Sequence, residues 1–350
     1  MTKQDSLELK GIAILMMLFL HLFNTEERVG ECITFLQIAG KPFVYLLSRL
    51  CGICVPIYIF ITGYGLAASW YKDSTHSLHP FRRLMRLYGS FWTVFLVFIP
   101  LACFISPQEY PNSIIDLLMN AACLTYTYNN EWWFLRPYII LLLFSPLIIS
   151  FMMRGKKECN LMLGISALSY GVWWLLCKTG WLFGFYPIEV IKNVFQIFLP
   201  FVYGIWVYKM DAVNKLHSWL LGMKRSKAIT MKLLGLLLPI ALCFVVKGVY
   251  MKALVFLPLL PFYLLTKRSD AFKRFVCFFG YHSTYMWLTH TFFCYYLFHS
   301  YIYGLKYPLL MYIVLVVVSL LSSYVCQWLH QLLSIAIDFV KSGVFRLNRK

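Results

Sequence analysis

The chain has 350 residues, of which 61% are hydrophobic and 13% are charged, and its mean hydropathy is +0.70. This composition excludes an ordinary soluble globular protein and predicts one that lies within a membrane. A net charge of +18 is compatible with nucleic-acid binding, but a nucleic-acid binder gathers its charge on one surface with recognisable motifs, and this sequence has none. We therefore expect no nucleic-acid partner.

Apolar segments long enough to cross about 30 Å of hydrocarbon recur along the whole chain. They predict an all-α polytopic membrane protein with about ten transmembrane helices. We expect a single membrane-embedded domain over residues 1–350 with no separate soluble domain. The predicted spans are residues 7–23, 44–69, 87–105, 133–152, 161–177, 194–208, 233–246, 249–265, 278–302 and 308–337.

The positions of the basic residues give an independent indication of topology, because lysine and arginine are retained on the cytoplasmic side. With both termini inside, 23 of the 32 Lys and Arg residues fall in inner segments and seven in outer loops. We therefore predict a multi-pass protein of the cell membrane with both termini cytoplasmic. The inner segments are residues 1–10, 70–86, 153–160, 209–232, 266–275 and 338–350, and the outer basic residues are Arg28, Lys41, Lys178, Lys192, Lys247, Lys252 and Lys306.

The first span contains two polar residues, Lys10 and His21. Their separation corresponds to about three helical turns, so the two side chains share a face and stand roughly 16 Å apart along the axis. A polar side chain inside the bilayer is costly and usually faces the bundle interior or a water-filled cavity. We expect Lys10 at the cytoplasmic headgroups and His21 deeper, towards the outer side. The alternative is a snorkelling lysine and a histidine that only hydrogen-bonds between helices.

The second span contains the sequence CVPIYIFITGYGL, residues 54–66. Pro56 is expected to kink this helix, because proline cannot donate a backbone hydrogen bond. Gly63 and Gly65 are expected to allow another helix to approach closely.

Three arginines, Arg82, Arg83 and Arg86, stand directly before the third span. Anchoring of the helix at the cytoplasmic face accounts for them. Binding of phosphate groups is the alternative, since guanidinium groups bind phosphate oxygens in pairs.

The fourth span opens on the sequence NNEWWFLRPY, residues 129–138. Glu131 is the acid closest to a helix mouth on the outer side, beside Trp132 and Trp133. An aromatic belt accounts for the tryptophans but not for the acid. The preceding loop, residues 106–130, has no Lys or Arg and contains the apolar stretch SIIDLLMNAA. We expect this loop to dip back into the outer leaflet.

The ninth span contains the sequence GYHSTYMWLTH, residues 280–290. Ser283 and His290 are two helical turns apart and therefore lie on the same face. They either line a polar cavity or pack against neighbouring helices.

Eleven cysteines are scattered mostly through the apolar spans, and Cys51 and Cys54 form a Cys-x-x-Cys pair. No acid or histidine stands near this pair at a spacing typical of metal ligands. We therefore expect packing residues, with no metal site and no disulfide framework.

Five short segments resemble, in the same order, motifs of the integral-membrane acyltransferase 3 family. Lys10, Gly11 and His21 resemble its opening Arg-Gly-x(9)-His pattern, with lysine in place of arginine. The run 55–64 is similar to its Val-Pro-x-Phe-x-x-x-Ser-Gly-Tyr segment. Arg82, Arg83 and Arg86 resemble its basic entry to the third helix, and Trp133-Phe134-Leu135 resembles its Trp-Phe-Leu triplet. The last match is to its Gly-x-x-Ser-Tyr-x-x-Tyr-Leu-x-His pattern, at Gly280, Ser283, Leu288 and His290. In this pattern Thr284 and Trp287 replace the two tyrosines.

The resemblance implies a membrane acyltransferase. Members of the family commonly move acetyl from acetyl-CoA to a hydroxyl group of a cell-surface polysaccharide, a lipid-linked sugar or a related acceptor. We therefore expect acyl-CoA as a donor substrate and no permanently bound cofactor. The sequence sets no oligomeric state.

The basic residues of the predicted inner face and the buried His21 suit acyl transfer from acyl-CoA. Lys10, Arg82, Arg83 and Arg86 are expected to hold the phosphates of acyl-CoA at the inner face. His21 has a reference pKa near 6.5, which suits a general base at neutral pH. It either takes the proton of the acceptor hydroxyl or carries the acyl group itself.

On the outer side, Glu131 is expected to orient the histidine or to bind the acceptor. Trp133 is expected to stack on a sugar ring, and Ser283 and His290 to line the substrate site. A transporter or flippase for a lipid-linked sugar or a small solute is the alternative, in which His21, Glu131 and His290 bind the cargo or relay protons.

Overall fold

The structure is a computed structural model that describes residues 1–72, 78–179, 184, 186–245 and 257–347, without the side chains of residues 244, 245 and 337–347. The chain forms two compact units. Unit 1 comprises Met1–Phe81 and Trp133–Tyr281, and unit 2 comprises Arg82–Trp132 and His282–Lys350.

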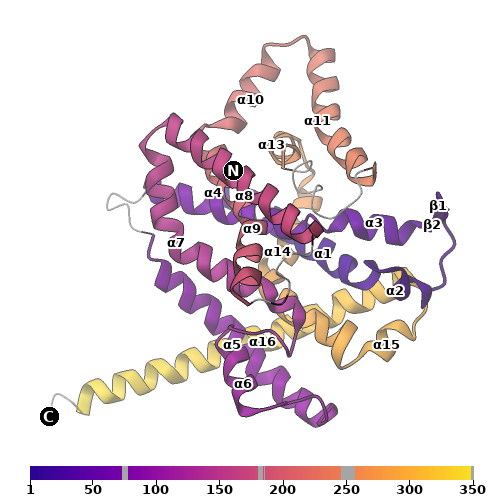
Figure 1. Ribbon diagram of the computed structural model, residues 1–350, viewed down its shortest axis with the longest axis vertical. Coiled ribbons are helices and arrows are strands. Elements are labelled where there is room, and N and C mark those ends of the chain that lie inside the picture. The colour runs from indigo at the N-terminus through magenta and orange to yellow at the C-terminus, as the bar shows by residue number, and fades with distance from the viewer. Residues whose placement is uncertain (73–77, 180–183, 185, 246–256, 348–350) are drawn as a thin grey trace. The chain divides into compact units, whose positions relative to one another are not determined.

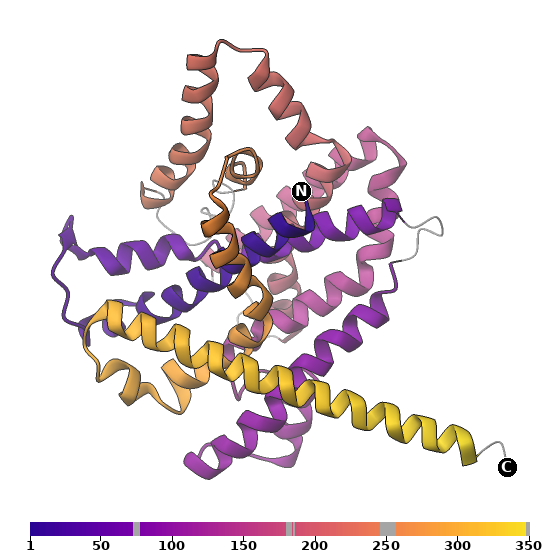
Figure 2. The ribbon, with the colours of Figure 1, turned by 180° about the vertical axis from the view of Figure 1, so that it is seen from behind.

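Unit 1 contains the first helix and the central helices of the chain (Figure 1; Figure 2, from behind). Its strands β1 and β2 form a small antiparallel hairpin. The elements are α1 (Lys3–Phe23), α2 (Glu26–Gly30), β1 (Gln37–Ile38), β2 (Lys41–Pro42), α3 (Phe43–Cys51), α4 (Cys54–Lys72), α7 (Leu135–Arg154), α8 (Lys156–Thr179), α9 (Tyr186–Lys209), α10 (Ala212–Leu221), α11 (Arg225–Val245), α13 (Leu259–Leu264) and the first part of α14 (Asp270–Thr291).

Unit 2 contains the last long helix and the segments that pack with it. Its elements are α5 (Pro80–Ile105) from Arg82 onwards, α6 (Ile114–Ala121), the start of the 3-10 helix η1 (Asn130–Phe134), the second part of α14, the π-helix η2 (Phe292–Tyr296), α15 (His299–Tyr303) and α16 (Pro308–Leu347).

Eight helical stretches among the described residues are long and apolar enough to cross a membrane. The two-residue strands β1 and β2 are the only strands in the same part of the chain. The prediction of an all-α polytopic membrane protein is therefore confirmed. Eight of the ten predicted spans coincide with these stretches. The predicted span 249–265 lies partly outside the described residues, and its described end contains α13.

The prediction of one continuous helix over residues 278–302 is wrong. Helix α14 begins earlier, at Asp270, and ends at Thr291. The wider π-helical turn η2 follows, and α15 begins as a separate short helix at His299. The polar residues His282, Ser283 and His290 lower the hydropathy of this segment, so α14 is not among the eight apolar stretches.

The predicted span 44–69 is divided into α3 and α4 at Gly52. Pro56 explains the position of this break. Because it has no backbone N–H, it cannot donate to the carbonyl of Gly52, and regular hydrogen bonding resumes with the bond from Ile57 to Ile53 at 3.2 Å.

Helix α9 begins eight residues before its predicted start, at Tyr186. Lys192 therefore lies inside a helix and not in an outer loop. Its side chain is buried, and its Nζ donates to the Oε1 of Glu189 at 2.7 Å. The ion pair with Glu189 compensates the charge of Lys192, which would be costly to bury alone in an apolar span.

Two glycine pairs bring helices of unit 1 into backbone contact. A Cβ atom on Gly11 of α1 would overlap the carbonyl oxygen of Val276 on α14, and one on Gly280 would overlap the carbonyl oxygen of Leu7. Gly63 of α4 and Gly204 of α9 face each other's helix in the same manner. Small residues allow such close crossings within membranes. The close approach predicted for Gly63 is confirmed, whereas Gly65 has open space beside it.

The core of unit 2 is aromatic. Trp132 packs edge-to-face against Phe91 and Phe292, with ring centroids 5.0 and 5.6 Å apart. Its indole N–H donates to the carbonyl of Leu288 at 3.1 Å. Each buried aromatic ring contributes apolar area, and the indole hydrogen bond satisfies the one polar atom of this cluster.

Candidate active site

Helix α1 carries the first two candidate residues, Lys10 and His21. The helix begins at a capping box in which Thr2 and Asp5 bond reciprocally. It packs against α3 and α4. The hydroxyl of Tyr58 on α4 donates to the carbonyl of Lys10 at 3.2 Å, and the neighbouring Gly11 lies at the crossing with α14. The position of Lys10 along the bundle is therefore fixed from two sides.

His21 lies near the far end of α1 and is 9% exposed. The helix ends two residues later, at Phe23, and Asn24 is its C-cap. Beyond it, the guanidinium of Arg28 donates to Asn24, and Lys41 pairs with Glu26 at 2.6 Å. The imidazole is thus buried in the bundle, next to a polar layer at the C-terminal end of α1.

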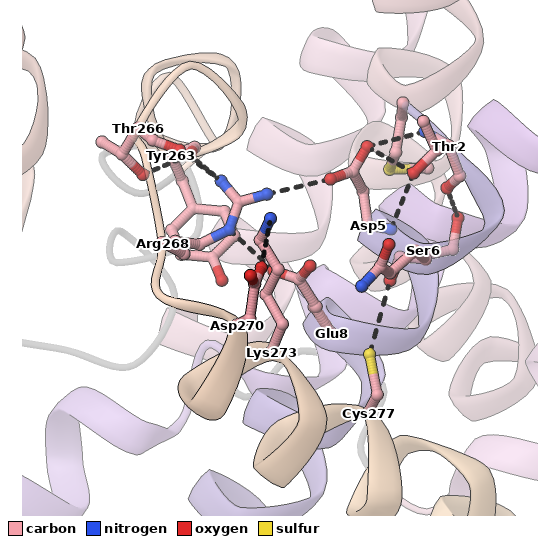
Figure 3. Close-up of polar contacts among 12 residues, drawn as sticks. Thr2, Asp5, Ser6, Glu8, Tyr263, Thr266, Arg268, Asp270, Lys273 and Cys277 are labelled. Atoms are coloured by element: carbon pink, nitrogen blue, oxygen red, sulfur yellow. Dashed lines mark hydrogen bonds and ion pairs between the residues drawn. The ribbon is translucent and has the colours of Figure 1, made fainter.

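An ion-pair cluster, which the sequence did not predict, holds the start of α1 (Figure 3). The guanidinium of Arg268 donates to Glu8 at 2.7 Å and to Asp5 at 2.9 Å. It also donates to the carbonyls of Tyr263 and Thr266, at 2.8 and 2.9 Å. Glu8 is 1% exposed, so its carboxylate is shielded from water and bonds to Arg268 instead. We call Asp5, Glu8 and Arg268 the Arg268 cluster.

A groove, which we call the Lys209 groove, lies where α4, α7 and α9 end and α10 begins, on the side predicted to be cytoplasmic. It consists of two pockets of about 330 and 410 Å³ that share Tyr71 and Lys209. Neither pocket is lined by Lys10 or His21. The first pocket is lined by Trp70, Tyr71, Ser150, Met153, Arg154 and Lys209, and the second by Tyr64, Tyr71, Tyr208, Lys209, Asp211 and Asn214.

The three arginines that precede the third predicted span lie in the first turns of α5, in unit 2. Arg82 and Arg86 are exposed and Arg83 is half-buried. Arg82 and Arg86 are four residues apart and therefore share a helix face. Such a pair presents two guanidinium groups in one direction.

Glu131 lies in η1, half-buried, and its backbone N–H donates to the Oδ1 of Asn129 at 3.1 Å. The amide of Asn129 in turn donates to the hydroxyl of Thr291 at 2.7 Å. Thr291 directly follows His290 in the chain. The structure therefore brings the Glu131 segment and the end of α14 together within unit 2. Trp133 belongs to unit 1, where it is half-buried and packs edge-to-face with Phe134.

His290 and Ser283 are both buried on α14. The Nδ1 atom of His290 lies 2.8 Å from the carbonyl oxygen of Trp287 and 3.2 Å from that of Met286. Carbonyl oxygens only accept hydrogen bonds, so Nδ1 carries the hydrogen and Nε2 is the basic atom of the neutral ring.

Arg136 is a buried charge within the predicted span 133–152. It lies in the first turn of α7 and is 7% exposed. Its guanidinium stacks over the ring of Tyr186 at 5.0 Å from the centroid. Its signal in the sequence is the arginine within an apolar span, which usually marks a bundle-facing position.

Groups of three or more His, Cys, Asp or Glu residues that could hold a metal do not occur in the described part of the chain. None of the eleven cysteines, all of which lie among the described residues, forms a disulfide, and Cys51 and Cys54 are buried. Burial raises the pKa of the Cys123 thiol, in the loop between α6 and η1, to about 12. Cys51 and Cys54 are 6% and 1% exposed, a burial typical of cysteines that pack as small apolar residues.

The order of the motifs along α1, α4, α5, η1 and α14 is that of one family. Residues 6–328 match the model of the acyltransferase 3 family, described as an acyltransferase domain. The chain belongs to this family. The protein is therefore a membrane acyltransferase, and the resemblance of its motifs is confirmed over nearly the whole chain. Comparisons with curated proteins and with solved structures give no match.

Close helix packing explains why this acyltransferase has glycine in its first and last motifs. Gly11 and Gly280 lie at the same crossing of α1 and α14, where neither position has room for a side chain. The motif residues Lys10 and Gly11 are thus held against α4 and α14 at once.

Proposed function

We propose that this acyltransferase moves an acyl group, acetyl from acetyl-CoA, to a hydroxyl group of a cell-surface polysaccharide, a lipid-linked sugar or a similar acceptor. The cell membrane is the proposed location, with acyl-CoA and the glycan as substrates and no permanently bound cofactor. Family membership supports the reaction class.

The observation that carries the proposal is the burial of His21 near the C-terminal end of a helix that bears a half-buried Lys10 in its N-terminal half. A desolvated imidazole is biased towards its neutral form, which is the form that accepts a proton. Polar residues in such a position are costly and are retained where they act on a substrate.

In the proposed step, the acceptor oxygen attacks the thioester carbonyl while His21 takes the hydroxyl proton. The carbon–sulfur bond then breaks, and the sulfur of CoA leaves and receives the proton. In the second route, His21 first carries the acyl group and then passes it to the acceptor. Both routes give the acylated acceptor and free CoA.

Lys10, Arg82, Arg83 and Arg86 are the proposed contacts to the donor's phosphates. Arg82 and Arg86 share one helix face, as two guanidinium groups that bind one phosphorylated group should. The lysine at position 10 keeps the charge of the family's arginine but not its two-pronged geometry.

Glu131, Trp133, Ser283 and His290 are the proposed contacts to the acceptor. The hydrogen bond between Asn129 and Thr291 supports a shared role for Glu131 and His290, because it holds their two segments together. In this role His290 offers Nε2 to the acceptor, since its Nδ1 donates within α14.

The proposal is tested by mass spectrometry of surface glycans from cells with and without the gene. We expect glycans of unchanged length that have lost one acetyl mass per modified sugar. If the whole glycan is missing from the surface while its intracellular precursor still carries acetyl groups, the protein exports the glycan, and the proposal is wrong.

A further inference from the structure

The Lys209 groove joins basic and aromatic side chains at the ends of three packed helices. Lys209 and Arg154 are the last residues of α9 and α7, and Trp70 and Tyr71 lie in the last turn of α4. Helix α9 packs against both α4 and α7, so the groove is built on the central contact of unit 1. Its shape therefore depends on firmly packed elements.

The first pocket offers two positive charges to a ligand. The Nζ of Lys209 donates to the carbonyl of Met153 at 2.9 Å, which leaves two of its three N–H groups for another acceptor. The exposed guanidinium of Arg154 lies over the ring of Phe151 at 5.7 Å. A lysine and an arginine side by side, without an acid in the same pocket lining, favour a phosphate group.

The second pocket offers aromatic faces. Tyr208 packs edge-to-face against Tyr64 and Tyr71, with centroids 5.3 and 6.3 Å apart. Tyr71 is nevertheless 69% exposed, so the ring shared by the two pockets has a large open surface. An exposed ring in a groove is a stacking platform for a purine base.

Asp211 and Asn214 close the second pocket with hydrogen-bond acceptors. Asp211 adopts the left-handed conformation, with a φ of 52°, between α9 and α10. The amide nitrogen of Asn214 donates to its Oδ1 at 2.8 Å. The Oδ2 of Asp211 and the amide oxygen of Asn214 then suit an amino group, such as the exocyclic amine of adenine.

We propose that the Lys209 groove binds the 3′-phosphoadenosine end of coenzyme A, with the 3′-phosphate at Arg154 and Lys209 and the adenine against Tyr71. The diphosphate of the same donor is then the group left for Lys10 and the arginines of α5. This inference rests on the proposed function, which makes acyl-CoA the donor. It assigns the nucleotide to Arg154, Lys209 and Tyr71, which the motifs of the sequence do not contain.

The groove lies close to the start of α1, the helix that carries Lys10 and His21. Tyr64, which lines the second pocket, is six residues beyond Tyr58 on α4, a rise of roughly 9 Å. The hydroxyl of Tyr58 is bonded to the carbonyl of Lys10. A nucleotide in the groove therefore has the start of α1 beside it, and a long flexible arm can follow that helix towards His21.

The phosphate of an anionic lipid headgroup is the other source of the same chemistry at this level of the membrane. A lipid needs the two cations but neither the open ring of Tyr71 nor the acceptors at Asp211 and Asn214. We therefore assign the groove to the nucleotide and use the lipid as an arm of the test.

The test is binding of radiolabelled coenzyme A to the purified full chain in nanodiscs of neutral phosphatidylcholine. The variants are Arg154→Gln, Lys209→Gln and Tyr71→Leu. The matched controls are Lys157→Gln, an exposed lysine at the start of the neighbouring α8, and Tyr71→Phe, which keeps the ring. Loss of a charge-assisted bond to a phosphate should weaken binding about tenfold.

The proposal predicts weaker binding in the three variants and wild-type binding in both controls. Adenosine 3′,5′-bisphosphate should displace coenzyme A, and dephospho-CoA should bind less tightly to the wild type than coenzyme A does. Equal binding by the variants and the wild type would place the nucleotide elsewhere, with the acyltransferase reaction untouched. Loss of binding on addition of anionic lipid, without displacement by the bisphosphate, would identify a lipid site and overturn the proposal.

If the wild-type chain binds no coenzyme A in any nanodisc, both the groove assignment and the proposed donor are wrong. Mass spectrometry of the surface glycans still reports on the transfer reaction in that case. The two failures are therefore distinguishable.

Discussion

The Nε of Arg268 donates to the Oε2 of Glu8 at 2.7 Å and thereby joins two segments that are 260 residues apart in the sequence. Because Asp5 binds the same guanidinium, both acids of α1's first turns are held by one side chain. Arg268 itself is held by the carbonyls of Tyr263 and Thr266. The Arg268 cluster therefore sets the position of α1, on which Lys10 and His21 are placed.

Replacement of Arg268 by glutamine should destabilise the protein. The buried carboxylate of Glu8 would lose its charged partner, which costs about 3–5 kcal/mol for a buried pair. Thermal unfolding of the purified chain, followed by size-exclusion chromatography, measures the effect.

Two further variants separate charge from packing in this experiment. Lys267→Gln, at the exposed neighbouring position, should unfold like the wild type. The double variant Glu8→Gln with Arg268→Gln should recover part of the stability, since no buried charge remains unpaired. A double variant less stable than Arg268→Gln alone would argue against the buried charge as the cause.

Replacement of Gly11 by alanine should separate α1 from α14. The new Cβ would overlap the carbonyl oxygen of Val276, and forced overpacking costs about 1–3 kcal/mol. Gly65→Ala is the matched control, because that position on α4 has open space. Comparable losses of folded protein for Gly11→Ala and Gly65→Ala would contradict the close crossing.

The arginines of α5 should contribute to donor binding through their geometry as well as their charge. Arg82→Gln with Arg83→Gln should raise the apparent KM for acetyl-CoA. The charge-conserving pair Arg82→Lys with Arg83→Lys preserves the topological signal but not the two-pronged contact, and it should also raise KM, by a smaller factor. An unchanged KM in both double variants would show that these arginines only anchor the helix at the membrane surface.

The charge distribution predicts the orientation of the chain. A reporter enzyme fused after residue 350 should be active only in the cytoplasm, because the inner segments carry most of the lysines and arginines. Reporter activity outside the membrane would invert the assignment of the Lys209 groove to the cytoplasmic side.

The sequence predicted most helices because hydropathy depends on local composition. It predicted a kink at Pro56 but neither the full division of the span 44–69 nor the end of α14, for different physical reasons. The break at Gly52 lies four residues before Pro56, at the carbonyl that proline leaves without a helical donor. The end of α14 at Thr291 and the π-helical turn after it occur in a segment whose apolar and polar residues alternate without a clear boundary.

The candidate site was predictable only in part. Lys10 and His21 could be found because polar residues stand out in an apolar span. The partner of Glu8 could not be found in this way, because Arg268 lies 260 residues away in the sequence and only tertiary packing brings the two together. The Lys209 groove was missed for the same reason, because its residues come from the ends of separate helices and each resembles an ordinary interfacial anchor.

The most direct test of the account measures transfer of labelled acetyl from acetyl-CoA to the glycan acceptor in membranes that contain equal amounts of the wild type, His21→Ala or Leu20→Ala. Leu20 is a half-buried neighbour on the same helical turn and controls for packing. The account predicts that His21→Ala lowers the transfer rate about 10²–10⁴-fold, the contribution of a general base, and that Leu20→Ala transfers like the wild type. A wild-type rate in membranes with His21→Ala would contradict the assignment of His21 to the reaction.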